Sequence, residues 1–194
     1  MKHAAAEALP TNPSISSSSP SASALAPSAD VLGDYWPGIQ IYYPPVKYAP
    51  ALGLYEDLEQ ASQRFKKHAW GTTAHTLIFD LEDGCRQKEM SRELLRRELP
   101  KMPKRKEVQV AVRINPFRTE EYEKDLQMVR DLSDHIDAVM LAKAGEAYGS
   151  PEIRDLSAVL VGLNHRITIQ PIIEHPKSLK IAPDLMQYAT VKHV

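Results

Sequence analysis

The stretch LIFDLEDG, residues 77–84, decides the fold of this chain. It is a short apolar run that ends abruptly in the carboxylates of Asp80, Glu82 and Asp83. Buried parallel strands are brief apolar runs of this kind, and catalytic groups in α/β folds collect where such strands end. Acids packed this closely repel one another unless a metal ion, an arginine or a lysine neutralises them. Taken alone, the stretch fits a catalytic strand end and a solvated loop with a helix-capping acid equally well.

Strand-like and helix-like segments alternate along the rest of the chain. Short apolar runs predict strands at residues 39–43, 76–81, 108–114, 138–141, 168–173 and 191–194. Amphipathic spacing and turn signals predict helices at residues 54–68, 88–99, 122–132, from Ser150 (as N-cap) and Pro151 onward, and 178–188. This serial alternation predicts a parallel sheet with helices outside it.

Two architectures use this alternation: an open doubly wound sheet and a closed (β/α)8 barrel. No Gly-rich phosphate loop follows the first predicted strand, where a dinucleotide-binding fold would place it. A barrel of eight units typically takes about 250 residues, whereas residues 35–194 have room for five units and the start of a sixth. The expected fold class is therefore α/β, a (β/α)8 TIM-barrel type that is incomplete in this chain.

Composition narrows the class of protein further. Residues 1–33 are rich in Ser, Ala and Pro, which predicts a disordered tail without the apolar segment of a secretory signal. The net charge of -1 gives no reason to expect nucleic acid or an anionic membrane as a partner. No apolar run approaches the roughly 18 residues that a membrane helix requires. The single cysteine, Cys85, excludes a disulfide framework and favours the cytoplasm, with organelle targeting as the alternative.

The other predicted strands also end in charged residues. Arg113 lies at the end of the third strand, Lys143 follows the fourth, and Glu174 follows the fifth. If the strands are parallel and in register, these side chains gather at one rim with Glu82 and Asp83. Carboxylates there can hold Mg²⁺, which can polarise a 2-oxo group and stabilise an enolate. An Arg fork can recognise a substrate carboxylate in bidentate fashion.

Each of these residues also has a purely structural interpretation. Arg113 and Lys143 can be ion-paired with neighbouring acids, as buried charges usually are. Glu174 can precede a helix and stabilise its macrodipole. Cys85 follows the acidic cluster, but no Cys-His-Asn order suggests a thiol nucleophile, so we interpret it as a bystander.

Four motifs in order carry a resemblance to a known family. The matched segments are FDLEDGC (79–85) followed by Lys88 and Ser91-Arg92, VRIN (112–115), DAVMLAK (137–143) and IE (173–174). The family's own versions read LDLEDAV followed by Lys and an Ala-Arg pair, VRIN, DAVMLPK and IET. On these motifs the chain resembles the HpcH/HpaI aldolase and citrate lyase β-subunit (CitE-like) family of TIM barrels.

The resemblance implies Mg²⁺-dependent cleavage or formation of a carbon–carbon bond in a 2-oxo acid or an acyl-CoA thioester. It implies an enolate stabilised by Mg²⁺ and Arg113, with Arg113 also clamping the substrate carboxylate and Lys143 beside it as a substrate-binding residue. Glu174 is the implied metal ligand, and Glu82 and Asp83 are implied as catalytic or metal-site acids. The implied assembly is a homo-oligomer, a trimer or hexamer, that binds a small-molecule substrate and neither nucleic acid nor a membrane.

The sequence departs from the family pattern at several positions. Gly38 stands where the family's first strand has a substrate-contacting Arg. Ala142 replaces the Pro of the DAVMLPK motif, His175 replaces the Thr of IET, and Gly84 stands in for a small Ala. The family's second metal carboxylate comes from a Gly-x-x-Asp segment after the sixth strand. The sequence ends at Val194 before such a segment, so we expect an incomplete metal site.

Two alternatives stay open beside the lyase. A truncated or degenerate family member would be a non-catalytic subunit that binds a partner or its own copies. An HpcH-like aldolase would act instead on hydroxy-oxo acids, and the loss of the first-strand Arg favours an unusual substrate.

Overall fold

The computed structural model describes residues 39–51, 53–146, 149–164 and 166–186. The tail predicted at residues 1–33, the position of Gly38 and the strand predicted at 191–194 lie outside these residues. All of the described residues belong to one compact unit of the chain, residues 37–194.

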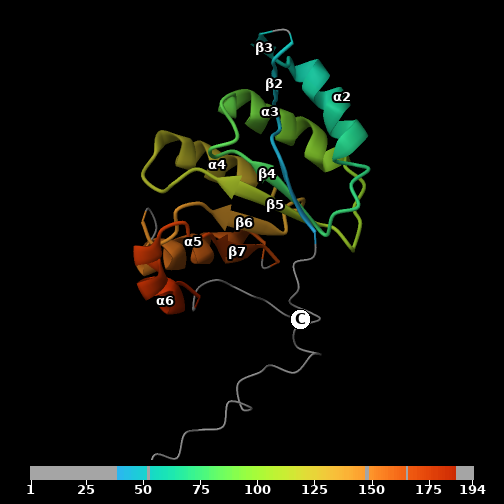
Figure 1. Cartoon of the computed structure of the whole chain (residues 1–194). Helices are drawn as coiled ribbons and strands as arrows, with labels where there is room; N and C mark the ends of the chain where they lie inside the picture. Colours follow the sequence, from blue (N-terminus) through green and yellow to red (C-terminus); the bar gives the residue numbers. More distant parts are fainter. Residues whose placement is uncertain (1–38, 52, 147–148, 165, 187–194) are drawn as a thin grey trace, which may run out of the picture. The chain divides into compact units, whose positions relative to one another are not determined.

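Parallel strands form the main sheet (Figure 1). In the order in which they lie side by side, the strands are β1 (Gln40–Tyr43), β4 (Thr76–Asp80), β5 (Gln109–Ile114), β6 (Ala138–Leu141) and β7 (Thr168–Pro171). Every neighbouring pair is parallel, so the carboxyl ends of the strands lie at one edge of the sheet. The strands follow one another in sequence order, as consecutive units of a TIM barrel do. The predicted fold class is confirmed, and the predicted strands agree with these to within two residues at each end.

A helical segment follows each strand of this sheet. The α-helices are α2 (Leu58–His68), α3 (Lys88–Glu98), α4 (Glu120–Asp131), α5 (Ser150–Leu163) and α6 (Ala182–Met186), with 3₁₀ turns η2 (Leu99–Lys101) and η3 (Pro176–Ile181). Among the described residues, no helix is both long and apolar enough to span a membrane.

The main core lies between the sheet and the helices, and aromatic stacking ties the two layers together. Leu77 and Phe79 of β4 pack with Phe65 of α2 and Leu95 of α3 in one apolar cluster. The rings of Phe65 and Phe79 are stacked with centroids 5.2 Å apart. Burial of each such side chain stabilises the fold by about 1.5–3 kcal/mol. Alternate strand residues such as Ile78 point to the other face, where they form a smaller apolar cluster.

The helix predicted at residues 54–68 begins later than expected. α2 starts at Leu58, because the Asp57 side chain accepts a hydrogen bond from Gln60 N at 2.8 Å and the Gln60 side chain accepts one from Asp57 N. This capping box is a strong helix start signal. The preceding residues Leu54–Tyr55 form β3, which pairs antiparallel with β2 (Tyr48–Ala49).

Two later helix starts also differ from the prediction. Ser150 was expected to cap α5, but it is the first helical residue and Gly149 is the N-cap. The helix predicted at 178–188 begins as η3 and becomes α-helical only at Ala182. Pro176 opens η3, where its fixed φ and missing N–H suit a first helical turn.

Candidate functional site

Arg113 and Asp80 form a bidentate ion pair at the carboxyl ends of β5 and β4. The two residues are direct partners in the parallel register of these strands. Arg113 Nε donates to Asp80 Oδ1 at 2.8 Å, and Arg113 Nη2 donates to Asp80 Oδ2 at 2.7 Å. Burial raises the pKa of Asp80, but the hydrogen bonds from Arg113 and from the backbone of Glu82 and Gly84, together with the charge of Arg113, outweigh it and hold the pKa below its usual value. The same hydrogen bonds raise the pKa of Arg113.

Asp80 also organises the loop that follows its own strand. Its carboxylate accepts hydrogen bonds from Glu82 N at 2.9 Å and from Gly84 N at 3.2 Å. A Cβ added at Gly84 would collide with Asp80 Oδ2, so a larger residue here would displace the Asp80 carboxylate. Asp80 therefore holds the acidic loop and the Arg113 guanidinium in one fixed arrangement.

Glu82 is the buried acid of the rim, and Lys143 is its main partner. Only 3% of the Glu82 side chain is exposed, and Lys143 Nζ donates to its Oε1 at 2.8 Å. This interaction raises the pKa of Lys143. Lys143 follows β6 with a φ of 57°, in the left-handed region that costs energy for a residue with a side chain. Its Nζ also lies 3.8 Å from Asp83 Oδ1, although the Asp83 side chain is largely exposed.

Glu174 completes the rim from the segment after β7. Its Oε1 lies 3.9 Å from Arg113 Nη1, and Glu82 Oε2 lies 3.6 Å from Arg113 Nη2. The five side chains predicted to share one rim, from Glu82 to Glu174, are therefore brought together. Both cations are also ion-paired with acids, as the structural interpretation of Arg113 and Lys143 expected.

The acids at the rim fit a magnesium ion that uses few protein ligands. Among the described residues, no group of three or more His, Cys, Asp or Glu side chains is placed to hold a metal ion. Mg²⁺ commonly takes only one or two protein carboxylates and completes its octahedron with water and substrate oxygens. Glu174 has carboxylate oxygens of the type that Mg²⁺ prefers, whereas both oxygens of Glu82 already accept hydrogen bonds from Lys143 and from Asp83 N.

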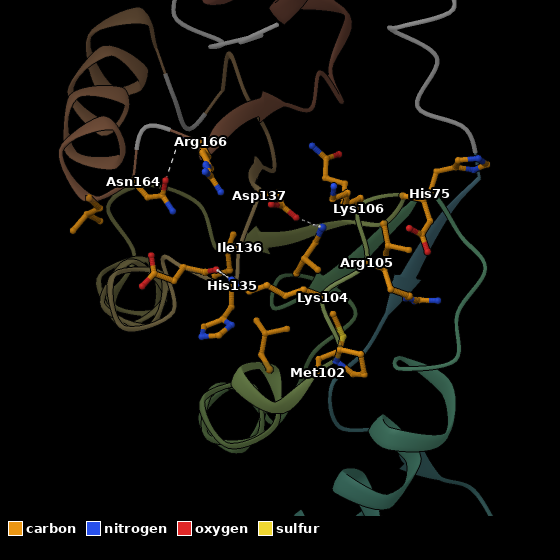
Figure 2. Close-up of a pocket in the computed structure, with 18 of the residues that line it drawn as sticks. His75, Met102, Lys104, Arg105, Lys106, His135, Ile136, Asp137, Asn164 and Arg166 are labelled. Atoms are coloured by element: carbon orange, nitrogen blue, oxygen red, sulfur yellow. Dashed lines mark hydrogen bonds between the residues drawn. The ribbon is translucent and has the colours of Figure 1, made fainter. Parts of the chain in front are cut away.

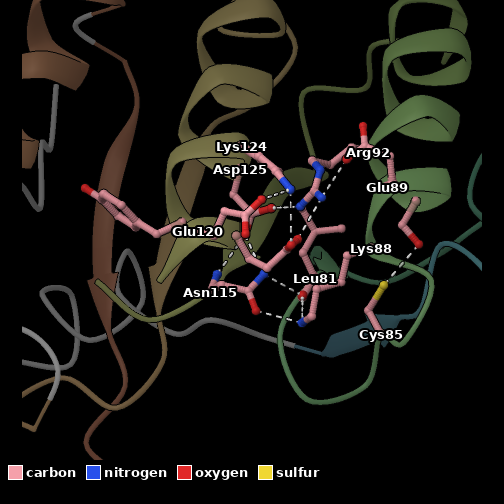
Figure 3. Close-up of polar contacts among 12 residues, drawn as sticks. Leu81, Cys85, Lys88, Glu89, Arg92, Asn115, Glu120, Lys124 and Asp125 are labelled. Carbon is pink, nitrogen blue, oxygen red and sulfur yellow. Dashed lines mark hydrogen bonds and ion pairs between the residues drawn. The ribbon is translucent and has the colours of Figure 1, made fainter. Parts of the chain in front are cut away.

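Lys88 anchors the acidic loop through its ammonium group (Figure 3). Its Nζ donates to the carbonyl oxygens of Leu81 and Glu82 at 2.8 and 2.9 Å, and to Asn115 Oδ1 at 2.7 Å. Asn115 Nδ2 in turn donates to Leu81 O at 2.8 Å. One ammonium group therefore ties the end of β4 to the segment after β5.

Arg92 extends this network into the helix layer, as Figure 3 shows. Its guanidinium is almost fully buried and donates to Asp125 Oδ1 at 2.7 Å and to Glu121 Oε2 at 2.7 Å. Asp125 accepts a hydrogen bond from Asn115 N at 2.8 Å. Hydrogen bonds therefore connect α3 through α4 to the end of β5. Burial opposes the charge on Arg92, but its acidic hydrogen-bond partners raise its pKa.

Sequence reasoning missed the supporting roles of Asp80 and Lys88. The sequence places Asp80 with Glu82 and Asp83 after one strand but assigns it no partner, although it lies opposite Arg113 once the strands are in register. Asp80 and Arg113 are each the last charged residue of their own strand. That shared position is the feature of the sequence that could have paired them. Lys88 was noted only as part of a motif, and its spacing from Leu81 carries no signal for its contacts.

A hollow of about 1360 Å³ lies at the opposite end of the sheet (Figure 2). Its lining residues include His75, Lys106, Asp137 and Arg166, which lie just before β4, β5, β6 and β7. Active sites of barrels lie at the carboxyl ends of the strands. This hollow is therefore separate from the rim that holds Arg113.

A family model described as HpcH/HpaI aldolase/citrate lyase matches residues 53–186 of the chain. This segment contains all of the rim residues described above. Comparison with curated proteins gave no match.

Three solved structures of protein CitE from Mycobacterium tuberculosis have a similar fold. They were determined with magnesium and pyruvate, with magnesium and acetate, and with magnesium and acetoacetate. Each aligns with a TM-score of 0.50 and 23% sequence identity over 76% of this chain. The alignment covers 49% of the CitE chain, so the present chain spans about half the length of those structures.

Proposed function

The chain belongs to the HpcH/HpaI aldolase/citrate lyase family, and on that premise we propose that it performs Mg²⁺-dependent carbon–carbon lyase chemistry. The proposed reaction cleaves or forms a bond in a 2-oxo acid or an acyl-CoA thioester. CitE from Mycobacterium tuberculosis was crystallised with magnesium and pyruvate, and pyruvate is a simple 2-oxo acid that serves as a probe for this chain. The site of the proposed chemistry is the rim that carries Arg113.

Glu174 is the proposed metal ligand. Its one ion pair among the described residues is the 3.9 Å contact with Arg113, a distance longer than a hydrogen bond, which leaves its oxygens available. Glu82 gives one oxygen to Lys143 and the other to the backbone N–H of Asp83, which suits a supporting role. Asp83 is exposed and would act through water. A bound magnesium ion would polarise the 2-oxo oxygen of the substrate.

Arg113 is the proposed clamp on the substrate. Its Nε–Nη2 edge is occupied by Asp80, so Nη1 is the donor that remains for a substrate carboxylate. Its positive charge would balance the negative charge that develops on the substrate as the bond breaks. Lys143 is the proposed second substrate contact, because an ammonium has three donors and Glu82 engages one of them.

One observation carries this proposal: the guanidinium of Arg113 lies among acids from different strand ends. Asp80 holds it by two hydrogen bonds, while Glu82 and Glu174 lie within 4 Å without direct hydrogen bonds to it. A structural ion pair needs only Asp80. The two further carboxylates favour a site where a cation and an anionic substrate are bound together.

Proton exchange in pyruvate tests the proposal. The protein is incubated with Mg²⁺ and pyruvate in D₂O, and loss of the methyl proton signal reports formation of the enolate. Arg113→Lys should slow this exchange by roughly tenfold or more, because an ammonium cannot reproduce the planar fork. Arg118→Lys is the matched control, since 79% of the Arg118 side chain is exposed and it lies outside the rim. Equal exchange in the Arg113 variant and the wild type would assign Arg113 to structural ion pairing.

The proposal extends to assembly and location. A homo-oligomer, a trimer or hexamer, follows from the family resemblance, and a CoA thioester is the alternative to a free 2-oxo acid as substrate. Cys85, a free and buried cysteine, supports a reducing compartment such as the cytoplasm.

A further inference from the structure

Tyr42 of β1 lies on the opposite face of the sheet from the helices. Its neighbour Tyr43 packs its ring against Phe65 and Phe79 in the main core. Side chains alternate along a strand, so Tyr42 points to the other face, beside its register partner Ile78. Its exposed fraction is 46%, which is high for a large aromatic residue. The ring belongs to neither of the two apolar clusters of the described residues.

The ring of Tyr42 contacts the guanidinium of Arg113. Arg113 Cζ lies over the ring at 5.3 Å from its centroid. Arginine stacks on aromatic faces in this way, and the ring's electron density attracts the cation. The Tyr42 hydroxyl makes no hydrogen bond to any residue in the part of the chain that the structure describes. The contact that the geometry shows is therefore made by the ring.

Two different groups thus restrain the same guanidinium. Asp80 holds its Nε–Nη2 edge through two hydrogen bonds, and the Tyr42 ring lies against Cζ. The hydrogen bonds restrain one edge of the guanidinium. The ring adds a second restraint from a different strand. The remaining donor, Nη1, then points to the side where Glu174 lies.

We propose that Tyr42 is a positioning residue that restrains the guanidinium of Arg113 and keeps Nη1 toward the place for a substrate carboxylate. The substrate part of this inference rests on the proposed function of Arg113, whereas the effect of Tyr42 on Arg113 does not. A carboxylate is the class of ligand that gains most, because a charge-assisted hydrogen bond from Nη1 depends on where that donor points. The positioning requires an aromatic ring. Replacing Tyr42 by Phe should therefore preserve it, and replacing Tyr42 by a non-aromatic residue should abolish it.

Nuclear magnetic resonance of the Arg113 Nε–Hε group in the full chain tests the positioning. The resonance is assigned by its loss in Arg113→Lys. In the wild type and in Tyr42→Phe we expect a restrained side chain, and in Tyr42→Leu we expect a clear drop in its order parameter. Ile41→Ala is the matched control, because Ile41 is a neighbouring residue of β1 with a similar exposed fraction of 41%. Unchanged Arg113 mobility in Tyr42→Leu would overturn the proposal, and so would equal loss of order in Tyr42→Phe and Tyr42→Leu.

Titration with pyruvate in the presence of Mg²⁺ separates this inference from the proposed function. Tyr42→Leu should bind pyruvate about 2- to 5-fold more weakly, the range of an exposed cation–π contact, and Tyr42→Phe should bind as the wild type does. If the wild type binds no pyruvate while Tyr42→Leu loosens Arg113, the proposed function fails and the positioning role stands. If pyruvate binds equally to all variants and Arg113 is unaffected, the positioning role fails and the function stands.

Discussion

At the scale of single residues, the site depends on Asp80 more than on any acid that could hold a metal. Its carboxylate accepts hydrogen bonds from the Arg113 side chain and from the backbone of Glu82 and Gly84. Charge-assisted hydrogen bonds of this kind are about twice as strong as neutral ones. They offset the cost of burying Asp80, whose residue is 5% exposed. The arginine of the proposed site is therefore held by an acid whose oxygens are already engaged by Arg113 and by the loop backbone.

Replacing Asp80 by Asn should destabilise the fold in a pH-dependent way. The variant leaves Arg113 charged with only the longer contacts to Glu82 and Glu174, and breaking a buried pair in this way costs up to about 3 kcal/mol. The pKa of Asp80 is lowered by folding. Its stabilisation is therefore fully present above the unfolded pKa of about 3.9 and is lost as the pH falls through the folded pKa. Urea denaturation at pH 7 and at stepwise lower pH should show the gap to wild type shrink below about pH 4.

Asp131→Asn is the control for this experiment. Asp131 pairs with Arg96 on the surface, where both side chains are more than a third exposed, so its loss costs about 0–1 kcal/mol. A gap for Asp80→Asn that stays constant down to pH 2 would show that the ion pair is not its source.

At the scale of elements, the rim is held by contacts between strand ends and the helices that follow. Lys88 at the start of α3 binds the carbonyl groups at the end of β4, and Arg92 one turn later binds α4. Family motifs in the sequence contain both residues, but periodicity alone gave only a charged amphipathic helix. The helix starts that the sequence predicted wrongly also have local causes. The capping box at Asp57 starts α2 late, and Gly149 takes the cap that Ser150 was expected to provide.

Replacing Lys88 by Met should loosen the acidic loop. The carbonyl groups of Leu81 and Glu82 lose a charged donor, and an unsatisfied buried acceptor costs about 1–3 kcal/mol. Hydrogen exchange at the backbone amides of residues 82–84 should become faster, and the free energy of unfolding should fall. Lys67→Met in α2 is the control, because Lys67 is exposed and makes no ion pair with any described residue. Equal protection of the loop in Lys88→Met and wild type would remove Lys88 from this role.

At the scale of the whole molecule, the order of strands was predictable and the geometry of the rim was only partly so. Regular spacing of apolar runs predicted the parallel sheet, and charged residues at strand ends predicted which side chains gather. Which acid pairs with Arg113 was not predictable, since the pairing depends on the strand register that sets Asp80 opposite Arg113. The contact of Tyr42 with Arg113 was also missed, because the two residues are on strands that do not pair directly.

The binding of Mg²⁺ to the chain, measured by isothermal titration in the presence of pyruvate, tests the central claim most directly. Glu174→Gln should weaken Mg²⁺ binding by roughly tenfold or more, the loss typical even of residues that only support a metal site. Glu59→Gln is the control, since 67% of the Glu59 side chain is exposed on α2, away from the rim. The account predicts Mg²⁺ binding in the wild type and in the control, with the loss confined to Glu174→Gln. Equal Mg²⁺ affinity in the wild type and Glu174→Gln would contradict the claim that this rim is a metal site.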